Sequence, residues 1–420
     1  MENDTIYSGF QSRLLHDGLQ PESWEGATLP PIVQSASHRH LTAESLSETF
    51  SGQRQAHIYM RLSNPTVSVL EEKVAALEGG GGAIYMASGM AAIANTCMAL
   101  LRAGDEFIAG RSLFMSTYLL FTRVFAKYDI TCHLCDPLDL DGMSRAINDR
   151  TRFIYLETIG NPAMDIPDLE QAARLAHSHG LPLVVDNTLA SPWLCRPVDF
   201  GADVVLHSTT KYLSGHGNAV GGLVVDCGRF DWLGSGRFSD FAPFVDRKGP
   251  LALRDRIWRE HHINYGTTGT PFHAYLTIIG MDTLALRMER HMDNAGQVAA
   301  FLTSRPEVSR VCYPGLAGHP CHQTAARMFS GRGFGGMLTF FLDSQDHCFR
   351  FIDALQMILH LANLGDCRSL VLHPASSQYV SFTEEERRHL DIADTMVRLS
   401  VGLEDIEDIL ADLEQALDRM

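Results

Sequence analysis

The 420-residue sequence has no long hydrophobic run and no cluster of basic residues. A membrane-spanning helix needs about 20 consecutive, mostly apolar residues, so none is expected. Acidic residues number 50 against 34 lysines and arginines, which gives a formal net charge of −16 at pH 7. Nucleic-acid-binding proteins carry a basic face. Neither a membrane nor a nucleic acid is therefore an expected partner, and the acidity mainly favours solubility.

The usual signals of secretion, disulfide bonding and metal binding are also missing. Residues 1–5 contain neither a basic region nor an apolar core, so no signal peptide is expected. The nine cysteines are an odd number and are scattered, which is typical of a reducing cytoplasm. Cys132 and Cys135 have CxxC spacing without a second pair, and no H-E-x-x-H pattern occurs, so we expect core thiols and no metal site. The glycine run at 79–82 lacks the Lys-Ser/Thr of a P-loop.

What is present is the composition of a soluble globular protein, 45% hydrophobic and 20% charged, long enough for one large and one smaller domain. We expect an extended N-terminal arm at residues 1–62 that contacts a neighbouring subunit, a large domain at 63–280 and a C-terminal domain at 281–420. Asn64 and Pro65 should begin a helix over 67–77, which the glycine run ends.

From residue 83 strand and helix patterns alternate, which predicts an α/β fold with a mostly parallel sheet covered on both faces. Strands are expected at 83–87, 106–109, 130–134, 152–157, 182–186, 203–207 and 220–225, and helices at 89–101, 113–127, 139–148 and 168–179. Residues 228–270 break this pattern. Their aromatic content predicts an ordered insertion, placed near the functional site.

The pattern of the C-terminal part predicts a smaller α/β layer, which is an antiparallel sheet with helices on one side. A helix through 281–301 should bridge to it, with the charged run 287–291 on its solvated face. Strands are expected near 308–312, 336–342 and 396–401, and helices near 321–329, 346–358 and 404–418. The glycine-rich run 331–336 follows no strand and is interpreted as a turn.

The candidate reactive residue is Lys211, which follows the apolar run 203–206 in the segment His-Ser-Thr-Thr-Lys. Burial would lower its pKa and let it form a Schiff base with a carbonyl cofactor. The hydroxyls of Ser208 and Thr210 would point the same way on an extended chain and suit a phosphate. A lysine beside a phosphate site suggests pyridoxal phosphate (PLP); the alternative is a strand end with a solvated lysine.

Two upstream segments offer the remaining parts of a PLP site. Asp186 ends the apolar strand 182–186 and could pair with the pyridine nitrogen, although an aspartate there could also be a structural cap. Ser88, Gly89 and Met90 lie where a strand turns sharply into a helix, whose N-terminus supplies phosphate donors. Glycine would let the backbone approach the phosphate closely. An ordinary strand-to-helix connection is the alternative here.

In these segments the chain resembles the PLP-dependent enzymes of cysteine and methionine metabolism: cystathionine synthases and lyases, methionine γ-lyase and homoserine-ester sulfhydrylases. The matching motifs run in family order over nearly the whole chain: YMR at 59–61, SGM at 88–90, NP at 161–162, DNT at 186–188, STTK at 208–211 and RLSVG at 398–402. The resemblance implies the aspartate-aminotransferase-like fold of type I, and a homotetramer built as a pair of dimers with shared active sites.

The resemblance also implies roles for particular residues. Tyr59 and Arg61 would reach the phosphate from a neighbouring subunit, and Asn161 would lie near the cofactor's 3-hydroxyl. Arg398 would bind the substrate's α-carboxylate, for which a structural ion pair is the alternative. Asn363 lies in the motif ANLGD at 362–366, which looks most like O-acetylhomoserine sulfhydrylase.

One position departs from the commonest pattern: Phe114 stands where most of the family has a tyrosine that stacks on the cofactor and assists proton transfer. Phenylalanine keeps the stacking and loses the hydroxyl, which favours substrates with a good leaving group. Ser116 stands where methionine γ-lyases carry a cysteine. The expected reaction is γ-replacement on O-acetylhomoserine or another O-acylhomoserine by sulfide or a thiol. A γ-lyase is the alternative, and a non-catalytic PLP-fold protein is a third hypothesis, against which intact Lys211, Asp186 and Arg398 argue.

Overall fold

The computed structural model describes residues 7–420, so residues 1–5, on which the signal-peptide expectation depends, lie outside the described residues. Its larger sheet has seven strands in the order β1-β7-β6-β5-β4-β2-β3. All seven strands expected for this domain are present: β1 (Gly82–Met86), β2 (Glu106–Gly110), β3 (Thr131–Cys135), β4 (Thr151–Glu157), β5 (Leu183–Asp186), β6 (Val204–Ser208) and β7 (Gly222–Asp226). β7 runs antiparallel to both of its neighbours, and the other pairings are parallel. The expectation of a mostly parallel sheet is confirmed.

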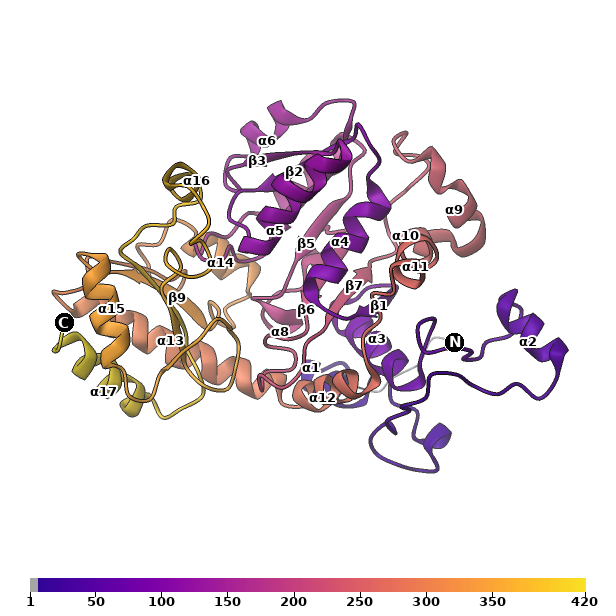
Figure 1. The fold of residues 1–420 in the computed structure, drawn as a ribbon, viewed down its shortest axis with the longest axis horizontal. Helices are drawn as coiled ribbons and strands as arrows, with labels where there is room; N and C mark the ends of the chain where they lie inside the picture. The colour runs from indigo at the N-terminus through magenta and orange to yellow at the C-terminus, as the bar shows by residue number, and fades with distance from the viewer. Residues whose placement is uncertain (1–6) are drawn as a thin grey trace.

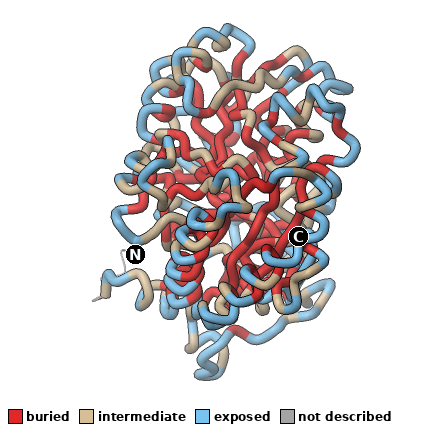
Figure 2. The backbone as a smooth tube through the Cα atoms, turned by 90° about the vertical axis from the view of Figure 1, so that its left-hand side faces the viewer, coloured by how far each residue is buried: buried red, intermediate tan, exposed pale blue. Residues whose placement is uncertain are grey.

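Helices cover both faces of this sheet, and the strands are buried at its centre (Figures 1 and 2). One hydrophobic core joins the sheet to α3 (Pro65–Glu78), α6 (Leu140–Ala146), α7 (Leu169–Ser178), α8 (Ser191–Leu194) and α12 (Pro271–Met281). A second core joins the other face to α4 (Gly89–Leu100), α5 (Met115–Leu119) and the π-helical turn Leu120–Val124. As expected, Asn64 caps α3 with its side chain, Pro65 fits its first turn, and Gly79 ends it in a left-handed conformation (φ 76°).

The smaller domain contains a five-stranded sheet in the order β10-β11-β12-β9-β8. The three strands expected here correspond to β8 (Arg310–Cys312), β9 (Met337–Phe341) and β12 (Met396–Ser400); β10 (Leu359–His360) and β11 (Leu370–Leu372) were missed. Only the β10–β11 pair is parallel. α13 (Leu284–Ser304), α15 (Gln345–Ala354) and α17 (Ile406–Leu417) share its hydrophobic core, while α14 (His322–Met328) joins the core of the larger domain and α16 (Glu384–His389) has no buried residue.

The bridging helix is present as α13, whose first turns join the larger core and whose later turns join the smaller one. The expectation that residues 287–291 form a solvated face holds for Glu289 and Arg290, which are exposed, and is wrong for Arg287 and His291. Arg287 is 5% exposed and donates to the carbonyl oxygens of Tyr212 and Gly280, and His291 is fully buried. The arginine is buried because it satisfies carbonyl groups at the junction, which a charge pattern along one helix does not reveal.

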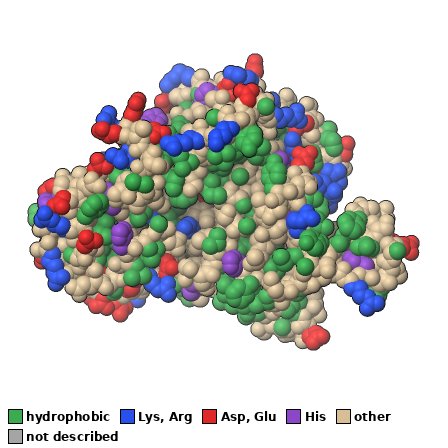
Figure 3. Space-filling view, in the orientation of Figure 1, with side chains coloured by type: hydrophobic (Ala, Val, Ile, Leu, Met, Phe, Trp, Pro, Cys, Tyr) green, Lys and Arg blue, Asp and Glu red, His purple; other side chains and the backbone are tan. Residues whose placement is uncertain are grey.

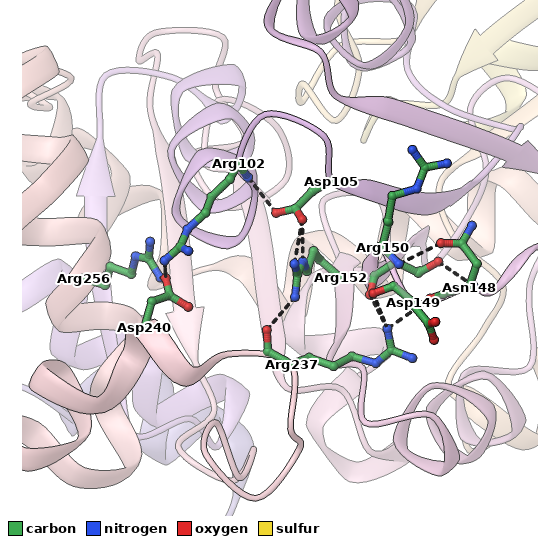
Figure 4. A network of polar contacts seen from close by, with 10 residues as sticks. Arg102, Asp105, Asn148, Asp149, Arg150, Arg152, Arg237, Asp240 and Arg256 are labelled. Atoms are coloured by element: carbon green, nitrogen blue, oxygen red, sulfur yellow. Dashed lines mark hydrogen bonds and ion pairs between the residues drawn. The ribbon is translucent and has the colours of Figure 1, made fainter.

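Residues 228–270 are ordered, as expected, and contain α9 (Ala242–Lys248), α10 (Ala252–Arg256), the π-helical segment Ile257–His262 and α11 (Ile263–Tyr265). Figure 4 shows how this insertion is fastened. Arg152 at the start of β4 donates to Asp105 and to the carbonyl of Arg237, and Arg237 donates back to the carbonyls of Asn148 and Thr151. These contacts lie at the amino ends of the strands. Only the last part returns to the opposite end, where Thr267 accepts from Ala87. The expectation of an insertion near the site therefore holds only for that last part.

The N-terminal segment is less irregular than expected, since it contains α1 (Phe10–His16) and α2 (Ala43–Phe50). α1 packs on α3, with Leu14 fully buried and its carbonyl accepting from buried Lys73. The chain then extends away from the body, and α2 lies at the end of this projection (Figure 1). Its contact with a neighbouring subunit stays a prediction.

Candidate active site

A cavity of about 250 Å³ opens at the carboxyl ends of the parallel strands, between the two domains' sheets. This is the edge at which open α/β sheets bind their ligands. Eleven of the thirteen residues proposed from the sequence line it: Ser88, Gly89, Met90, Phe114, Asn161, Asp186, Ser208, Thr210, Lys211, Asn363 and Arg398. Segments 310 residues apart in the sequence thus contribute to one site.

Lys211 extends into this cavity from the turn after β6, where its ammonium group donates to Asn363 Oδ1 at 2.6 Å. Burial, and secondarily the charge of Arg398, lower the pKa of Lys211 to about 8. Because neutral amine is the nucleophilic form, a lysine so placed is available to a carbonyl compound near neutral pH.

Asp186 ends β5 and presents its carboxyl group to the same cavity. Thr188 donates to Asp186 Oδ1 through both its backbone N–H (3.0 Å) and its hydroxyl (2.5 Å), and Tyr155 donates to Oδ2 at 3.4 Å. Burial raises the pKa of Asp186, and the donors oppose this rise. A carboxylate oriented in this way suits a cationic ring N–H.

The turn from β1 into α4 forms another wall. Ser88 caps α4 by accepting from Ala91 N at 3.1 Å, and the N–H groups of Gly89 and Met90 belong to the first turn, which has no intrahelical acceptors. A Cβ atom on Gly89 would lie 2.7 Å from Ser208 Cβ, so glycine is required where α4 packs on β6. Thr210 Oγ1 accepts a hydrogen bond from the backbone N–H of Gly221 at 3.1 Å. Hydroxyls and free N–H groups at a helix N-terminus are the donors that phosphate needs.

Arg398 lies on β12 and is only 2% exposed. Its guanidinium donates to three neutral oxygens, Oδ1 of Asn161 (3.2 Å), Oε1 of Gln378 (3.2 Å) and the carbonyl of Asn363 (3.1 Å). No carboxylate among residues 7–420 lies within ion-pair distance of it, and burial lowers its pKa to about 10. A buried cation without a counter-ion on a cavity wall favours an anionic ligand over the structural ion pair.

The sequence interpretation missed several lining residues, among them Glu157, Thr188 and Gln378. Glu157 ends β4 and accepts the backbone N–H of Phe114 at 2.8 Å, which fixes the loop that carries the phenyl ring. Burial, and then the nearby Asp186, raise the pKa of Glu157 well above its usual range. Its place at the end of strand 152–157 was a usable signal, whereas Gln378 lies in a turn without any pattern.

Tyr59 and Arg61 are the two proposed residues that do not line the cavity. Tyr59 is 44% exposed, and the Arg61 guanidinium lies 5.5 Å from its ring centroid and donates to the carbonyl of Ile263. Within one chain they face outward, so their proposed role requires a second chain.

The donor set fits PLP: a lysine with lowered pKa, a carboxylate for the ring nitrogen, a phenyl ring for stacking, and hydroxyl and N–H donors for the phosphate. Across residues 7–420, no group of three His, Cys, Asp or Glu side chains could hold a metal ion. No helix in the same range is long and apolar enough to cross a membrane.

Comparison with known proteins agrees with this fit. The chain is 40% identical to the L-methionine gamma-lyase of Pseudomonas putida over 99% of both chains. It is 38% identical to the O-acetyl-L-homoserine sulfhydrylase of Leptospira meyeri, over 96% of this chain and 95% of that one. A putative O-acetylhomoserine (thiol)-lyase of Campylobacter jejuni, solved with N′-pyridoxyl-lysine-5′-monophosphate, superposes with a TM-score of 0.95 at 32% identity, covering 98% of this chain and all of that one.

The aspartate-aminotransferase-like α/β architecture expected from the sequence is therefore confirmed, and the cofactor is PLP. The family model for Cys/Met metabolism PLP-dependent enzymes matches residues 11–418, and the chain belongs to that family.

Proposed function

We propose that this enzyme catalyses γ-replacement on O-acetylhomoserine, or another O-acylhomoserine, with sulfide or a thiol. With sulfide and the acetyl ester the products are homocysteine and acetate. The observation that carries the proposal is Phe114 on the cavity wall that also contains Lys211 and Arg398. The wall offers an aromatic ring without a hydroxyl where proton assistance to a poor leaving group would be needed.

Arg398, Lys211 and Asp186 have separate roles in the proposed reaction. Arg398 binds the α-carboxylate of the amino acid, because its guanidinium is buried, forked and held by three neutral acceptors. Lys211 carries protons between substrate carbons, since its lowered pKa keeps a neutral amine available. Asp186 holds the ring nitrogen. PLP, when bound, supplies the electron sink that makes the α-proton acidic.

The leaving group decides between the family's activities. A carboxylate departs as a stable anion and needs little acid assistance, whereas the thiolate that leaves from methionine is a poorer leaving group. Phe114 cannot donate a proton, so its ring favours the ester substrate. Ser116, two residues further on, places a hydroxyl where the resemblance to methionine γ-lyases calls for a thiol.

The second candidate is a γ-lyase, in which water ends the reaction and an oxo acid and ammonia are formed. The chain is 40% identical to the Pseudomonas putida lyase and 38% identical to the Leptospira meyeri sulfhydrylase. The γ-lyase therefore remains a candidate function. The two identities differ too little to choose between the reactions.

We further propose that the active site is completed by a second subunit within a homotetramer. Tyr59 and Arg61 face away from their own cavity and carry a tyrosine and a guanidinium suited to phosphate. Figure 3 shows hydrophobic side chains over α12 and the projecting N-terminal segment, and the exposed apolar residues there include Leu41, Phe50 and Phe272. Exposed apolar surface of this kind is typical of a protein interface.

The cytoplasmic location is likewise proposed, supported by nine unpaired cysteines.

The test is a matrix of purified holoenzyme with acetyl-, succinyl- and phosphohomoserine, each with and without sulfide, beside methionine alone. We expect homocysteine from an acylhomoserine and sulfide to form at least about tenfold faster than oxo acid forms from methionine. Equal or faster release of oxo acid from methionine would replace the proposal by the γ-lyase. A PLP-loaded protein that turns over neither a homoserine derivative nor methionine would contradict both.

A further inference from the structure

A buried carboxylate–imidazole pair lies behind the strand ends that carry the cavity. Glu78, the last residue of α3, and His207, on β6, are 0% and 1% exposed. His207 Nε2 lies 2.6 Å from Glu78 Oε1. His207 and Ser208 are consecutive on the strand and so point to opposite faces of the sheet. Ser208 lines the cavity, and His207 points away from it toward α3.

Two further residues connect this pair to the neighbouring strands. Asn187 donates to Glu78 Oε1 at 2.8 Å and to the carbonyl of Cys195 at 2.9 Å. The hydroxyl of Thr158 donates to Asn187 Oδ1 at 2.8 Å. Both residues are fully buried. The network thus joins the ends of β4, β5 and β6 on the face opposite to the cavity.

Three of the four network residues are next in sequence to a residue of the cavity wall. Thr158 follows Glu157, Asn187 follows Asp186, and His207 precedes Ser208. Movement of a network residue therefore moves a cavity residue through one peptide unit. Asp186 is the most sensitive of these, because its carboxylate must meet a single ring nitrogen with hydrogen-bond geometry.

Burial of the Glu78–His207 pair is unfavourable for the free energy of folding, which suggests that the pair has a function other than packing. Glu78 Oε2 and His207 Nδ1 have no hydrogen-bond partner among the described residues. A buried polar pair with unsatisfied atoms is often no more stable than an apolar replacement. Packing alone would thus be served equally well by apolar side chains.

The structure assigns to Glu78 and His207 the role of positioning residues for Asp186. Both fix its carboxylate through Asn187, and His207 also favours its ionised form from the neighbouring strand β6. The inference depends on the proposed contact of Asp186 with the cofactor ring nitrogen. In support, the charge of His207 opposes the rise that burial causes in the pKa of Asp186.

Other ionisable groups near the pair do not replace it. Arg196 donates to the backbone carbonyl of Glu78, not to its carboxylate. Burial raises the pKa of Cys195 and of Cys227 well above the usual range, so both stay neutral thiols near pH 8. Asp203 lies at the amino end of β6, where it accepts from His177 at 2.8 Å.

The test is a pH titration of the cofactor's visible absorption band in holoenzyme, together with the dissociation constant of PLP. His207→Gln removes the charge that favours ionised Asp186, so the ring nitrogen carries less positive charge and the Lys211 nitrogen holds its own proton more tightly. We expect the midpoint of the band to move to higher pH by at least about 0.5 unit, and PLP affinity to fall at least threefold. Glu78→Gln should change both readouts in the same direction.

Two controls make the outcome specific. His177→Gln breaks an imidazole–carboxylate pair at the other end of β6 and should leave both readouts unchanged, whatever it does to the melting temperature. Asp186→Asn should move the midpoint more than His207→Gln. If Asp186→Asn moves nothing, the proposed role of Asp186 fails, and that result is separate from a failure of the present inference.

If Asp186→Asn shifts the band while folded His207→Gln and Glu78→Gln lose only thermal stability, the pair is structural and the inference is overturned. Should both variants fail to fold, Thr158→Val decides, because it removes one hydroxyl from the network without changing side-chain shape. A shifted midpoint in that variant supports the positioning role, and an unshifted one contradicts it.

Discussion

The clearest consequence of the site geometry concerns Arg398, which has no counter-ion among residues 7–420. Arg398→Lys keeps a positive charge on β12 but loses the planar fork that can hold both oxygens of a carboxylate. The lysine ammonium also has to donate hydrogen bonds from a single nitrogen to the acceptor oxygens of Asn161, Gln378 and Asn363. We expect the variant to fold and bind PLP, and to bind α-amino acids weakly.

The magnitude follows from the lost hydrogen bond. A hydrogen bond to a charged group contributes about 1.5–3 kcal/mol, and lysine retains one of two such bonds to the carboxylate. Each 1.4 kcal/mol is about tenfold, so the affinity for the carboxylate should fall roughly 10- to 150-fold. Because the site is buried, added salt should change this factor little.

The assay compares two unreactive ligands, norvaline and butylamine, which differ by one carboxylate. Their dissociation constants are measured from the change in the cofactor's visible absorption. Wild-type enzyme should prefer norvaline strongly, and Arg398→Lys should lose that preference by the stated factor. Arg368→Lys is the matched control, since Arg368 is exposed and paired with Asp366. An unchanged preference in Arg398→Lys would show that another group binds the carboxylate.

Three more outcomes are expected from the same site. The rate of PLP recombination with apo-protein should rise with pH to a midpoint near 8, because the amine of Lys211 must be neutral, and Arg398→Leu should move that midpoint upward; stopped-flow absorbance measures it. Phe114→Tyr should raise methionine elimination relative to replacement, measured as oxo acid against homocysteine, and an unchanged ratio would contradict the leaving-group argument. Mixing and reassembling Arg61→Ala with Lys211→Ala should recover up to about a quarter of wild-type activity if sites are shared in symmetric pairs, and none if each chain supplies its own Arg61.

Much of the site could be predicted because its residues follow strands. Asp186 and Ser208 end strands β5 and β6, and Lys211 lies three residues beyond β6. Parallel strands bring such positions to one edge. Arg398 is different, since it lies within β12 of the other sheet, and only the resemblance pointed to it. Nothing in the local pattern around Gln378 indicates that a turn of the smaller domain reaches the cavity.

The errors in the fold have physical causes as well. β10 and β11 contain two and three residues, too few for a strand period to be recognised. The insertion at 228–270 was expected near the site because loops of this length are usually functional, and its aromatic residues predicted only that it is ordered. They instead pack together, with Trp232 stacked on Phe241 at 4.4 Å, and arginines fasten the segment to the amino ends of the strands. Aromatic content predicted the order of the segment correctly, whereas its length predicted its location poorly.

Arg398 and Lys211 share one small cavity, and their charges oppose each other. Burial is the larger cause of the low pKa of Lys211, and the guanidinium charge is the second. A bound α-carboxylate neutralises Arg398 and removes the second cause while burial remains. The amine of Lys211 should therefore be more basic with substrate present than without it. The lowered pKa makes more neutral amine available when the cofactor binds, and a bound carboxylate then makes the amine a better proton acceptor. Proton transfer between substrate carbons requires this order. In the proposed function, the lack of a counter-ion for Arg398 among residues 7–420 thus connects binding of the α-carboxylate to the basicity of Lys211.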